Sequence, residues 1–430
     1  MWKYVMMIVA GVATSGYMFT FFFKFWPVLN TKNILAIIGG LVIIYQIFTR
    51  RIHSIDKNFV QLLLFSITLS IIALFSAIYN NTNDFSYVSY PRTFLIWLIA
   101  GYAVCALIFY IHKKITLSIL GNYMVSVCIA QSLFALLIAY IPAFKNFINT
   151  FIEQDQEFLE GVNRMYGIGA SVDVAGTRFA AVLIVLSVLI VRSIKKYDFK
   201  LLRLYLISFV VISLVGNMIA RTTTIGLILG LINLLFSLRK YFMNVIGINK
   251  ILIQFAVVLF PMLFFIIVSF FAFPEFETHV RFALEGFFNL VNKGEFTTAS
   301  SDRLFSVMYV FPETLKTWVI GDGYFSNPRY DPYYVGELTG GYYMGTDAGY
   351  LRFIFYFGLI GLLTFAVYFI KAAHVCSNFF NENKNLFIML LALNFIIWFK
   401  VSTDIFLIFA LFGVAGALNE YSYSQKIVTK

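Results

Sequence analysis

The arginines of this chain are distributed differently from its lysines. With the apolar segments taken as membrane spans and the N-terminus placed in the cytoplasm, the predicted outer loops hold 8 of 13 Arg but only 6 of 19 Lys. These eight are Arg92, Arg164, Arg178, Arg221, Arg281, Arg303, Arg329 and Arg352. Orientation signals favour cations on the cytoplasmic side, so an arginine-rich outer face needs another cause. Because a guanidinium group binds phosphate oxygens in a bidentate manner, we expect an outer site for a phosphorylated, lipid-linked substrate.

Four arginines from separate segments are the best candidates for this anion site. Arg164 ends the first long loop, Arg221 stands in a tight turn, Arg303 begins a loop helix and Arg352 begins a span. A single arginine at a span end is often a snorkelling side chain that only marks the membrane boundary. Convergence from four loops favours the anion site instead. Further candidates for substrate binding are Arg178, Arg281, His279 and Tyr350.

Three carboxylates could serve as a general base. An acceptor hydroxyl attacks more readily when a carboxylate can take its proton. Asp347 lies five residues before Arg352 and is the first candidate. Asp302 and Asp173 are alternatives, and each of the three could instead cap a helix or hold an arginine in an ion pair.

Other polar and aromatic positions have two interpretations. Tyr350 belongs to a Tyr-rich segment that could stack on sugar rings or form the aromatic belt at the headgroups. His279 could bind substrate, although a lone interfacial His is more often structural. Lys400 and Asp404 are four residues apart and could form a helical ion pair or line the site. The acidic stretch 153–160 holds Glu and Asp at a spacing seen in some metal-binding transferases, but a solvated surface is favoured. We predict no metal.

The composition requires a membrane protein. Hydrophobic residues make up 60%, charged residues 12%, and the mean hydropathy is +0.84. A span needs about 20 apolar residues. Twelve segments are candidates, four of them short: 5–23, 33–48, 59–79, 93–111, 117–140, 177–194, 201–219, 223–238, 251–273, 350–370, 386–399 and 402–418. We predict an all-α polytopic membrane protein, one domain over residues 1–430, with about twelve transmembrane helices and no fewer than ten.

Charges in the short loops orient the chain. Most cations fall in segments that would be cytoplasmic, and this orientation places both termini in the cytoplasm. The formal net charge of +11 then reports membrane orientation, so nucleic acid is not expected as a partner. Two outer loops, 141–176 and 274–349, are long, and loops of this length are uncommon without a function.

The larger outer loop is expected to fold against the membrane surface. Residues 279–291 carry apolar side chains suited to a helix lying in the interface. A second helix is predicted from about 302 to 318, bent or interrupted at Pro312. A segment rich in Gly and Tyr then leads to the span that starts at residue 350.

Several local motifs carry a family resemblance. They are Arg164-Met-Tyr-Gly167, Ala220-Arg-Thr222, Ser301-Asp-Arg303, Gly321-Asp-Gly323 and Thr346-Asp-Ala-Gly-Tyr-Leu-Arg352 followed by Gly358-Leu-Ile-Gly361. The chain resembles the O-antigen polymerase (Wzy) family, within the O-antigen ligase and polymerase superfamily. The resemblance implies a fold similar to GT-C glycosyltransferases and a multi-pass location in the bacterial inner membrane. It also implies a periplasmic active site, undecaprenyl-pyrophosphate-linked oligosaccharide substrates and a partner protein that controls chain length.

The resemblance implies a polysaccharide repeat-unit polymerase. The terminal sugar hydroxyl of one lipid-linked repeat unit would attack the anomeric carbon of a glycan on undecaprenyl pyrophosphate. Arginines would stabilise the departing pyrophosphate, and Asp347 would deprotonate or orient the acceptor. These arginines are Arg164, Arg221, Arg303 and Arg352. No cofactor is required, because the glycosyl pyrophosphate already stores the bond energy.

Two other functions stay open. The ligase branch of the superfamily carries a functional His shortly before the span that follows its large loop. This chain has Asp347 there, which favours a polymerase, although His279 leaves room for a ligase. A flippase for the same lipid-linked oligosaccharide would also have about twelve spans. Flippases usually have short loops and charges inside the membrane, whereas most spans here lack ionisable residues and the length lies in two outer loops.

Overall fold

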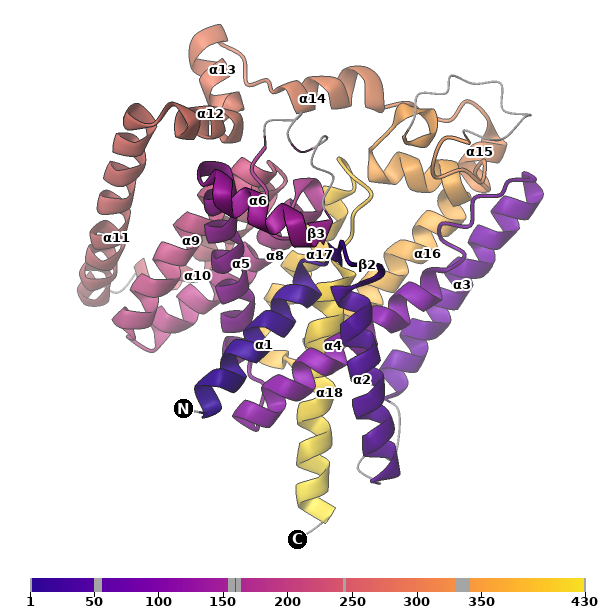
Figure 1. The fold of residues 1–430 in the computed structure, drawn as a ribbon, viewed down its shortest axis with the longest axis horizontal. Coiled ribbons are helices and arrows are strands. Elements are labelled where there is room, and N and C mark those ends of the chain that lie inside the picture. Colours follow the sequence, from indigo (N-terminus) through magenta and orange to yellow (C-terminus); the bar gives the residue numbers. More distant parts are fainter. Residues whose placement is uncertain are drawn as a thin grey trace.

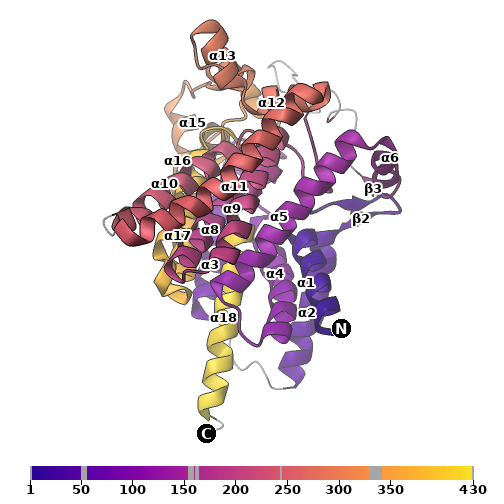
Figure 2. The same ribbon diagram turned by 90° about the vertical axis from the view of Figure 1, so that its left-hand side faces the viewer.

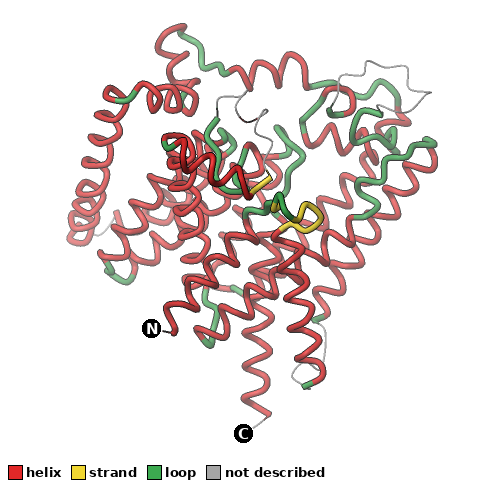
Figure 3. The backbone as a smooth tube through the Cα atoms, viewed as in Figure 1, coloured by secondary structure: helices red, strands yellow, loops and turns green. Residues whose placement is uncertain are grey.

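The computed structural model describes residues 2–49, 56–153, 159, 164–242, 245–328 and 341–428. Helices dominate this part of the chain, and strands are confined to one small region (Figure 3). Within the described residues, eight helices are long and apolar enough to cross a membrane. The predicted all-α polytopic membrane architecture is therefore confirmed at this level.

A helix lies over each of the twelve predicted spans. They are α1 (Trp2–Met18), α2 (Thr31–Phe48), α3 (Lys57–Tyr79), α4 (Tyr90–His112), α5 (Leu117–Tyr140), α8 (Val172–Lys195), α9 (Phe199–Ile219), α10 (Thr223–Phe242), α11 (Val245–Ala272), α16 (Gly349–Phe379), α17 (Lys384–Ile397) and α18 (Phe406–Val428). The α17 helix has 14 residues. At about 1.5 Å per residue it is about 21 Å long, less than the roughly 30 Å hydrocarbon core. Twelve crossings therefore stay a prediction.

Short polar residues start several of these helices. The Asn30 side chain accepts the backbone N–H of Asn33 at 2.8 Å before α2. The Asp198 side chain accepts that of Leu201 at 3.1 Å before α9. Such caps satisfy N–H groups that the first turn of a helix leaves unpaired. They place helix starts more sharply than hydropathy does.

The end of the first predicted span is wrong. We expected it to run to residue 23, but α1 ends at Met18 and β1 (Phe22–Phe23) follows. β1 pairs antiparallel with both β2 (Trp26–Asn30) and β3 (Ile152–Glu153), in the order β2-β1-β3. Aromatic residues extend an apolar run, yet they also favour strands. This small sheet ties the end of α1 to the first long loop.

The α8 helix forms the centre of the bundle. It is buried along most of its length and packs against α5, α9, α10 and α17. A Cβ on Gly226 of α10 would lie 2.2 Å from the Ala180 Cα of α8, so only glycine permits this close crossing. By contrast, α11 lies at the edge of the bundle and exposes Phe260 and Phe264 (Figures 1 and 2). Exposed apolar helix faces are expected where lipid is the solvent.

The long connections gather at one end of the bundle, called here the loop face (Figure 1). This end carries α6 (Pro142–Phe151), α12 (Pro274–Ala283), α13 (Glu285–Lys293), α14 (Ala299–Arg303), the π-helix η1 (Leu304–Met308), α15 (Leu315–Val319) and the 3₁₀-helix η2 (Tyr343–Gly345). Both chain ends lie toward the opposite end, the terminus face, where the 3₁₀-helix η3 (Asn381–Asn383) precedes α17.

Two helices predicted in the larger loop are each divided. The interfacial helix is split at Leu284 into α12 and α13, with Val291 strongly exposed. The predicted helix from 302 to 318 is interrupted, as Pro312 led us to expect. It starts earlier, at α14, because Thr298 and Ser301 form a capping box.

Candidate functional site

Arg352 is fixed at the start of α16 by four contacts with three neighbouring residues. Its side chain is 5% exposed. Nη1 donates to Ser402 Oγ at 2.6 Å, and Nη2 donates to the carbonyl of Phe325 at 3.0 Å. The guanidinium carbon lies 3.6 Å from the ring centre of Phe325 and 3.9 Å from that of Tyr342. Nε is buried without a hydrogen-bond partner among the described residues. The Nε–H is therefore not used by the protein groups described here.

Asp347 lies immediately before α16, as predicted, and faces Arg352. Its Oδ1 is 4.0 Å from Nη1 of Arg352. Burial raises the pKa of the Asp347 carboxyl to about 6 and Asp173 adds to this, although Arg352, Lys400 and Arg303 oppose the rise. A carboxyl with this pKa exchanges a proton near neutral pH, as a general base must.

Lys400 links two segments that are distant in sequence. Its Nζ donates to Asp173 Oδ1 at 2.7 Å and to Thr222 Oγ1 at 3.0 Å, and the Thr222 hydroxyl donates to the same carboxylate. A helical Lys400–Asp404 ion pair is wrong, because the chain between α17 and α18 is not helical there. Asp404 instead accepts the backbone N–H of Phe406 at 2.8 Å. Asp173 thus holds a cation in place.

Arg164 and Arg221 share one aromatic ring. The guanidinium carbon of Arg221 lies 4.2 Å from the centre of the Phe282 ring, and that of Arg164 lies 5.2 Å from it. Arg221 also donates to the Phe282 carbonyl at 3.0 Å and is ion-paired with Glu285. Burial lowers the pKa of Arg221; Arg164 lowers it further, while Glu285 raises it. The charge of Arg164 thus acts against that of Arg221, and the Glu285 carboxylate already offsets part of this repulsion.

A cavity of about 250 Å³ opens beside Arg164. Its lining includes Lys145 and His279, together with Ile138, Ala139, Leu159, Met165 and Tyr166. Burial lowers the pKa of His279, with Glu275 opposing, which favours the neutral imidazole. Nε of Arg164 and Nδ1 of His279 are buried with no hydrogen-bond partner in the part of the chain described. The cavity is a candidate anion site of the predicted kind.

The loop that carries Arg164 is held by a buried amide. Gln131 of α5 accepts the backbone N–H of Ile168 at 2.9 Å and donates to its carbonyl at 3.0 Å. Gly169 has φ +65, and a Cβ there would lie 2.9 Å from the Thr20 carbonyl. Gln131 was missed by the sequence analysis, although a lone amide inside an apolar span was a usable signal.

The Gly321-Asp-Gly323 motif supports the first turns of α16. The α16 helix is broken at residues 357–358. The carbonyl of Phe355 accepts the N–H of Asp322 at 2.6 Å, and the carbonyl of Tyr356 accepts that of Gly323 at 3.2 Å. These bonds satisfy carbonyls that the break would leave unpaired.

Two further predicted residues, Arg178 and Arg303, have no direct contact with Arg352 among the interactions of the described residues. Arg178 of α8 is buried against Phe19 at 5.8 Å and forms no hydrogen bond or ion pair within the described ranges. Arg303 is exposed and acts on Asp347 through its charge.

The structure does not bring Arg281 and Tyr350 into the same group. Arg281 is half exposed, pairs with Glu277 at 2.7 Å and stacks on Phe288. The Tyr350 hydroxyl donates to the Phe395 carbonyl at 2.9 Å. Two predicted positions, Arg329 and the Asp of the 153–160 stretch, lie outside the described residues.

Comparisons of this chain with protein-family models, with curated proteins and with solved structures find no match. Functional inference therefore depends on the site itself: cations from separate segments, placed at one end of a helical membrane protein, with Asp347 beside them.

Proposed function

We propose that this chain is a polysaccharide repeat-unit polymerase of the bacterial inner membrane. It transfers a glycan from undecaprenyl pyrophosphate to the terminal sugar of another lipid-linked repeat unit. The observation that carries the proposal is the meeting of Arg164, Arg221 and Phe282 beside a cavity of about 250 Å³ at the loop face. The loop face would then be periplasmic and both termini cytoplasmic.

The arginines account for binding and leaving-group stabilisation. A pyrophosphate carries several anionic oxygens, and guanidinium groups can donate two parallel hydrogen bonds to such oxygens. Arg164 presents an unpaired Nε at the cavity, while Arg221 is restrained by Glu285. Preorganised donors of this kind stabilise charge that develops in the transition state without having to move.

Asp347 and Arg352 account for acceptor activation. The acceptor hydroxyl oxygen attacks the anomeric carbon, the bond from that carbon to the pyrophosphate oxygen breaks, and the hydroxyl proton passes to Asp347. The lipid pyrophosphate leaves with the bonding electron pair. Arg352, 4.0 Å from Asp347, keeps the carboxylate oriented and partly ionised near neutral pH. Lys400 and Asp173 connect this part to Arg164, which interacts electrostatically with Asp173.

Reconstitution tests the proposal. The purified chain in liposomes, supplied with lipid-linked repeat units alone, should form a ladder of longer glycans and release undecaprenyl pyrophosphate. Arg164→Ala and Arg352→Ala should abolish the ladder at equal protein levels. Transbilayer movement of the lipid-linked repeat without any elongation would instead identify a flippase and contradict the proposal.

His279 gives one specific reason to keep the ligase as a second candidate. It lines the same cavity as Arg164, so it could orient an acceptor there. A polymerase elongates lipid-linked repeat units with no other acceptor present, whereas a ligase requires a different acceptor. Loss of activity in His279→Ala, combined with no elongation from repeat units alone, would favour the ligase.

A further inference from the structure

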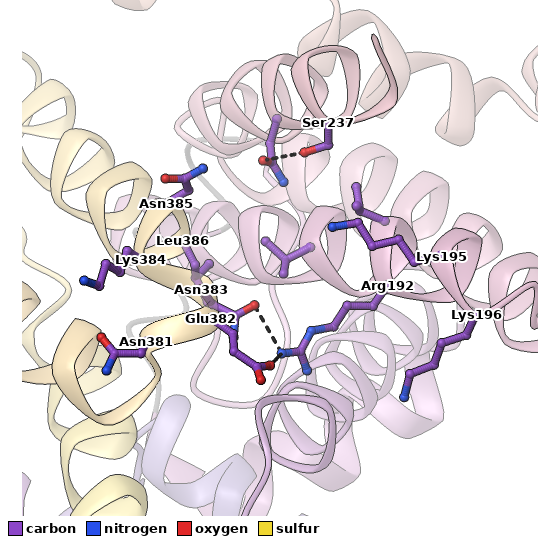
Figure 4. A pocket seen from close by; sticks show the side chains of 13 residues that line it. Arg192, Lys195, Lys196, Ser237, Asn381, Glu382, Asn383, Lys384, Asn385 and Leu386 are labelled. Carbon is purple, nitrogen blue, oxygen red and sulfur yellow. Dashed lines mark hydrogen bonds and ion pairs between the residues drawn. The ribbon is translucent and has the colours of Figure 1, made fainter. Parts of the chain in front are cut away.

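A second basic cavity lies at the terminus face, at the other end of α8 from Asp173. Its volume is about 560 Å³. Figure 4 shows side chains from α8, α10, η3 and α17 surrounding it. The charged groups in its lining are four cations, Arg192, Lys195, Lys196 and Lys384, and one carboxylate, Glu382. Strongly exposed Glu382 neutralises little of this charge.

The cations differ in how they are held. Arg192 is fixed: Nη1 donates to Ser118 Oγ and Nη2 to Asn383 Oδ1, both at 3.2 Å. Lys195, Lys196 and Lys384 are exposed and, within the described residues, form neither a hydrogen bond nor an ion pair. One anchored guanidinium, which is also ion-paired with exposed Glu382 at 3.7 Å, and three unpaired ammonium groups thus surround the cavity. Its lining therefore keeps an excess of positive charge.

The start of α17 adds further donors. The cavity lining includes Asn385 and Leu386 in the first turn of this 14-residue helix. The side chain of the N-cap residue, Asn383, does not cap the helix, because its Oδ1 accepts a hydrogen bond from Arg192 instead. Uncapped first-turn N–H groups and the helix dipole favour an anion at this position.

Apolar surface continues directly from the cavity. Ile388 is 62% exposed and lies one turn along α17 from Lys384 and Asn385. On α10, Phe236 directly precedes the cavity residue Ser237 in sequence, and its side chain is 72% exposed. A small soluble anion would make no contact with these apolar side chains, whereas the acyl chains of a lipid would pack against them.

We propose that this cavity binds the phosphate headgroup of an anionic phospholipid from the leaflet at the terminus face, with its acyl chains along α10 and α17. The phosphate lies between Arg192, the three lysines and the first turn of α17. Basic recesses between membrane helices are suited to such headgroups. This site is separate from the glycan-transfer site and is independent of the proposed function.

The full chain in detergent, titrated with phosphatidylglycerol or phosphatidylcholine and read by native mass spectrometry, tests the proposal. Phosphatidylglycerol should bind more tightly. Each lysine near a phosphate contributes about five-fold in affinity, so Lys195→Gln/Lys196→Gln should weaken phosphatidylglycerol binding about 25-fold and leave phosphatidylcholine unchanged. Lys384→Gln should weaken it about five-fold.

The matched control is Lys113→Gln/Lys114→Gln, two exposed lysines that follow α4 at the same face but do not line the cavity. It should change phosphatidylglycerol binding less than two-fold (about one third of a unit of log affinity). An equal loss in both double variants would overturn the proposal, because the effect would then be general surface charge. Glycerol phosphate binding as tightly as the lipid would also overturn it, by showing a free-anion site. Thermal unfolding of each variant confirms that the fold is retained.

Discussion

Replacing Asp347 by Asn should remove the acidic limb of the pH–rate profile and most of the activity. Burial raises the pKa of Asp347 from 3.8 to about 6. If the ionised carboxylate is the base, the wild-type rate should be half-maximal near pH 6, fall about tenfold for each pH unit below it and level off above it. The Asn variant cannot accept the proton, so its residual rate should not change across this range.

The same pKa predicts an effect on stability. The native state binds the Asp347 proton more tightly than the unfolded state, because the native pKa lies above the unfolded value of about 3.8. The stabilisation due to the protonated form is complete below pH 3.8 and is lost as the pH rises through about 6. The difference between the two pKa values corresponds to at most about 3 kcal/mol in the free energy of unfolding. Asp347→Asn should therefore raise the Tm at pH 7.5 and leave it unchanged at pH 4.

Two measurements check this reasoning. Initial rates of ladder formation from pH 4.5 to 8, for the wild type and Asp347→Asn, show whether the acidic limb of the pH–rate profile is present. Thermal unfolding of both proteins at pH 4 and pH 7.5 gives the difference in stability. An acidic limb that persists in Asp347→Asn would refute the assignment of this carboxyl as the base. A lower Tm for the variant at pH 7.5 would refute the burial argument, because it would mean that the ionised carboxylate stabilises the fold.

Four other substitutions test individual contacts. Arg352→Lys keeps the charge but loses the directed hydrogen bonds to Ser402 and the Phe325 carbonyl that hold the guanidinium beside Asp347, so the rate of elongation should fall about 10²- to 10³-fold; an unchanged rate would contradict the positioning role. Phe282→Leu removes the ring shared by two arginines and should raise the donor KM about 2- to 30-fold with little change in kcat; a pure kcat effect would count against this. Gln131→Leu leaves the N–H and carbonyl of Ile168 unpaired and should cost about 1–3 kcal/mol for each group, seen as a lower Tm. Arg281→Gln breaks a half-exposed ion pair with Glu277 and the stacking contact with Phe288, and should change stability by no more than about 2 kcal/mol, with normal elongation, which makes it the control for loop arginines.

The positions of the helices could be predicted well because hydropathy acts over whole segments. A helix overlaps every predicted span, and Asp347 lies just before α16 as expected. The errors come from short-range chemistry that hydropathy does not register. Phe22 and Phe23 belong to a strand, and Thr298 starts a loop helix earlier than expected.

The partners of the site residues could not be predicted in the same way. The sequence leaves open whether Lys400 pairs with Asp404, four residues on, or lines the site, whereas in the structure it contacts Asp173, 227 residues away. Contacts of this kind depend on how helices pack, and a single sequence contains no periodic signal for them. The sequence predicts Phe282 only as part of an apolar helix face, whereas in the structure its ring contacts the guanidinium groups of both Arg164 and Arg221.

The break in α16 has a mechanical consequence. The short stretch of helix before residues 357–358 ends in carbonyls that accept hydrogen bonds from the Gly321–Gly323 turn instead of from the next turn of α16. Its tilt is therefore set by a loop contributed from elsewhere in the chain. A residue inserted in that turn would therefore change the tilt of this first stretch of α16. Arg352 would move with it, although no side chain around the arginine had been replaced.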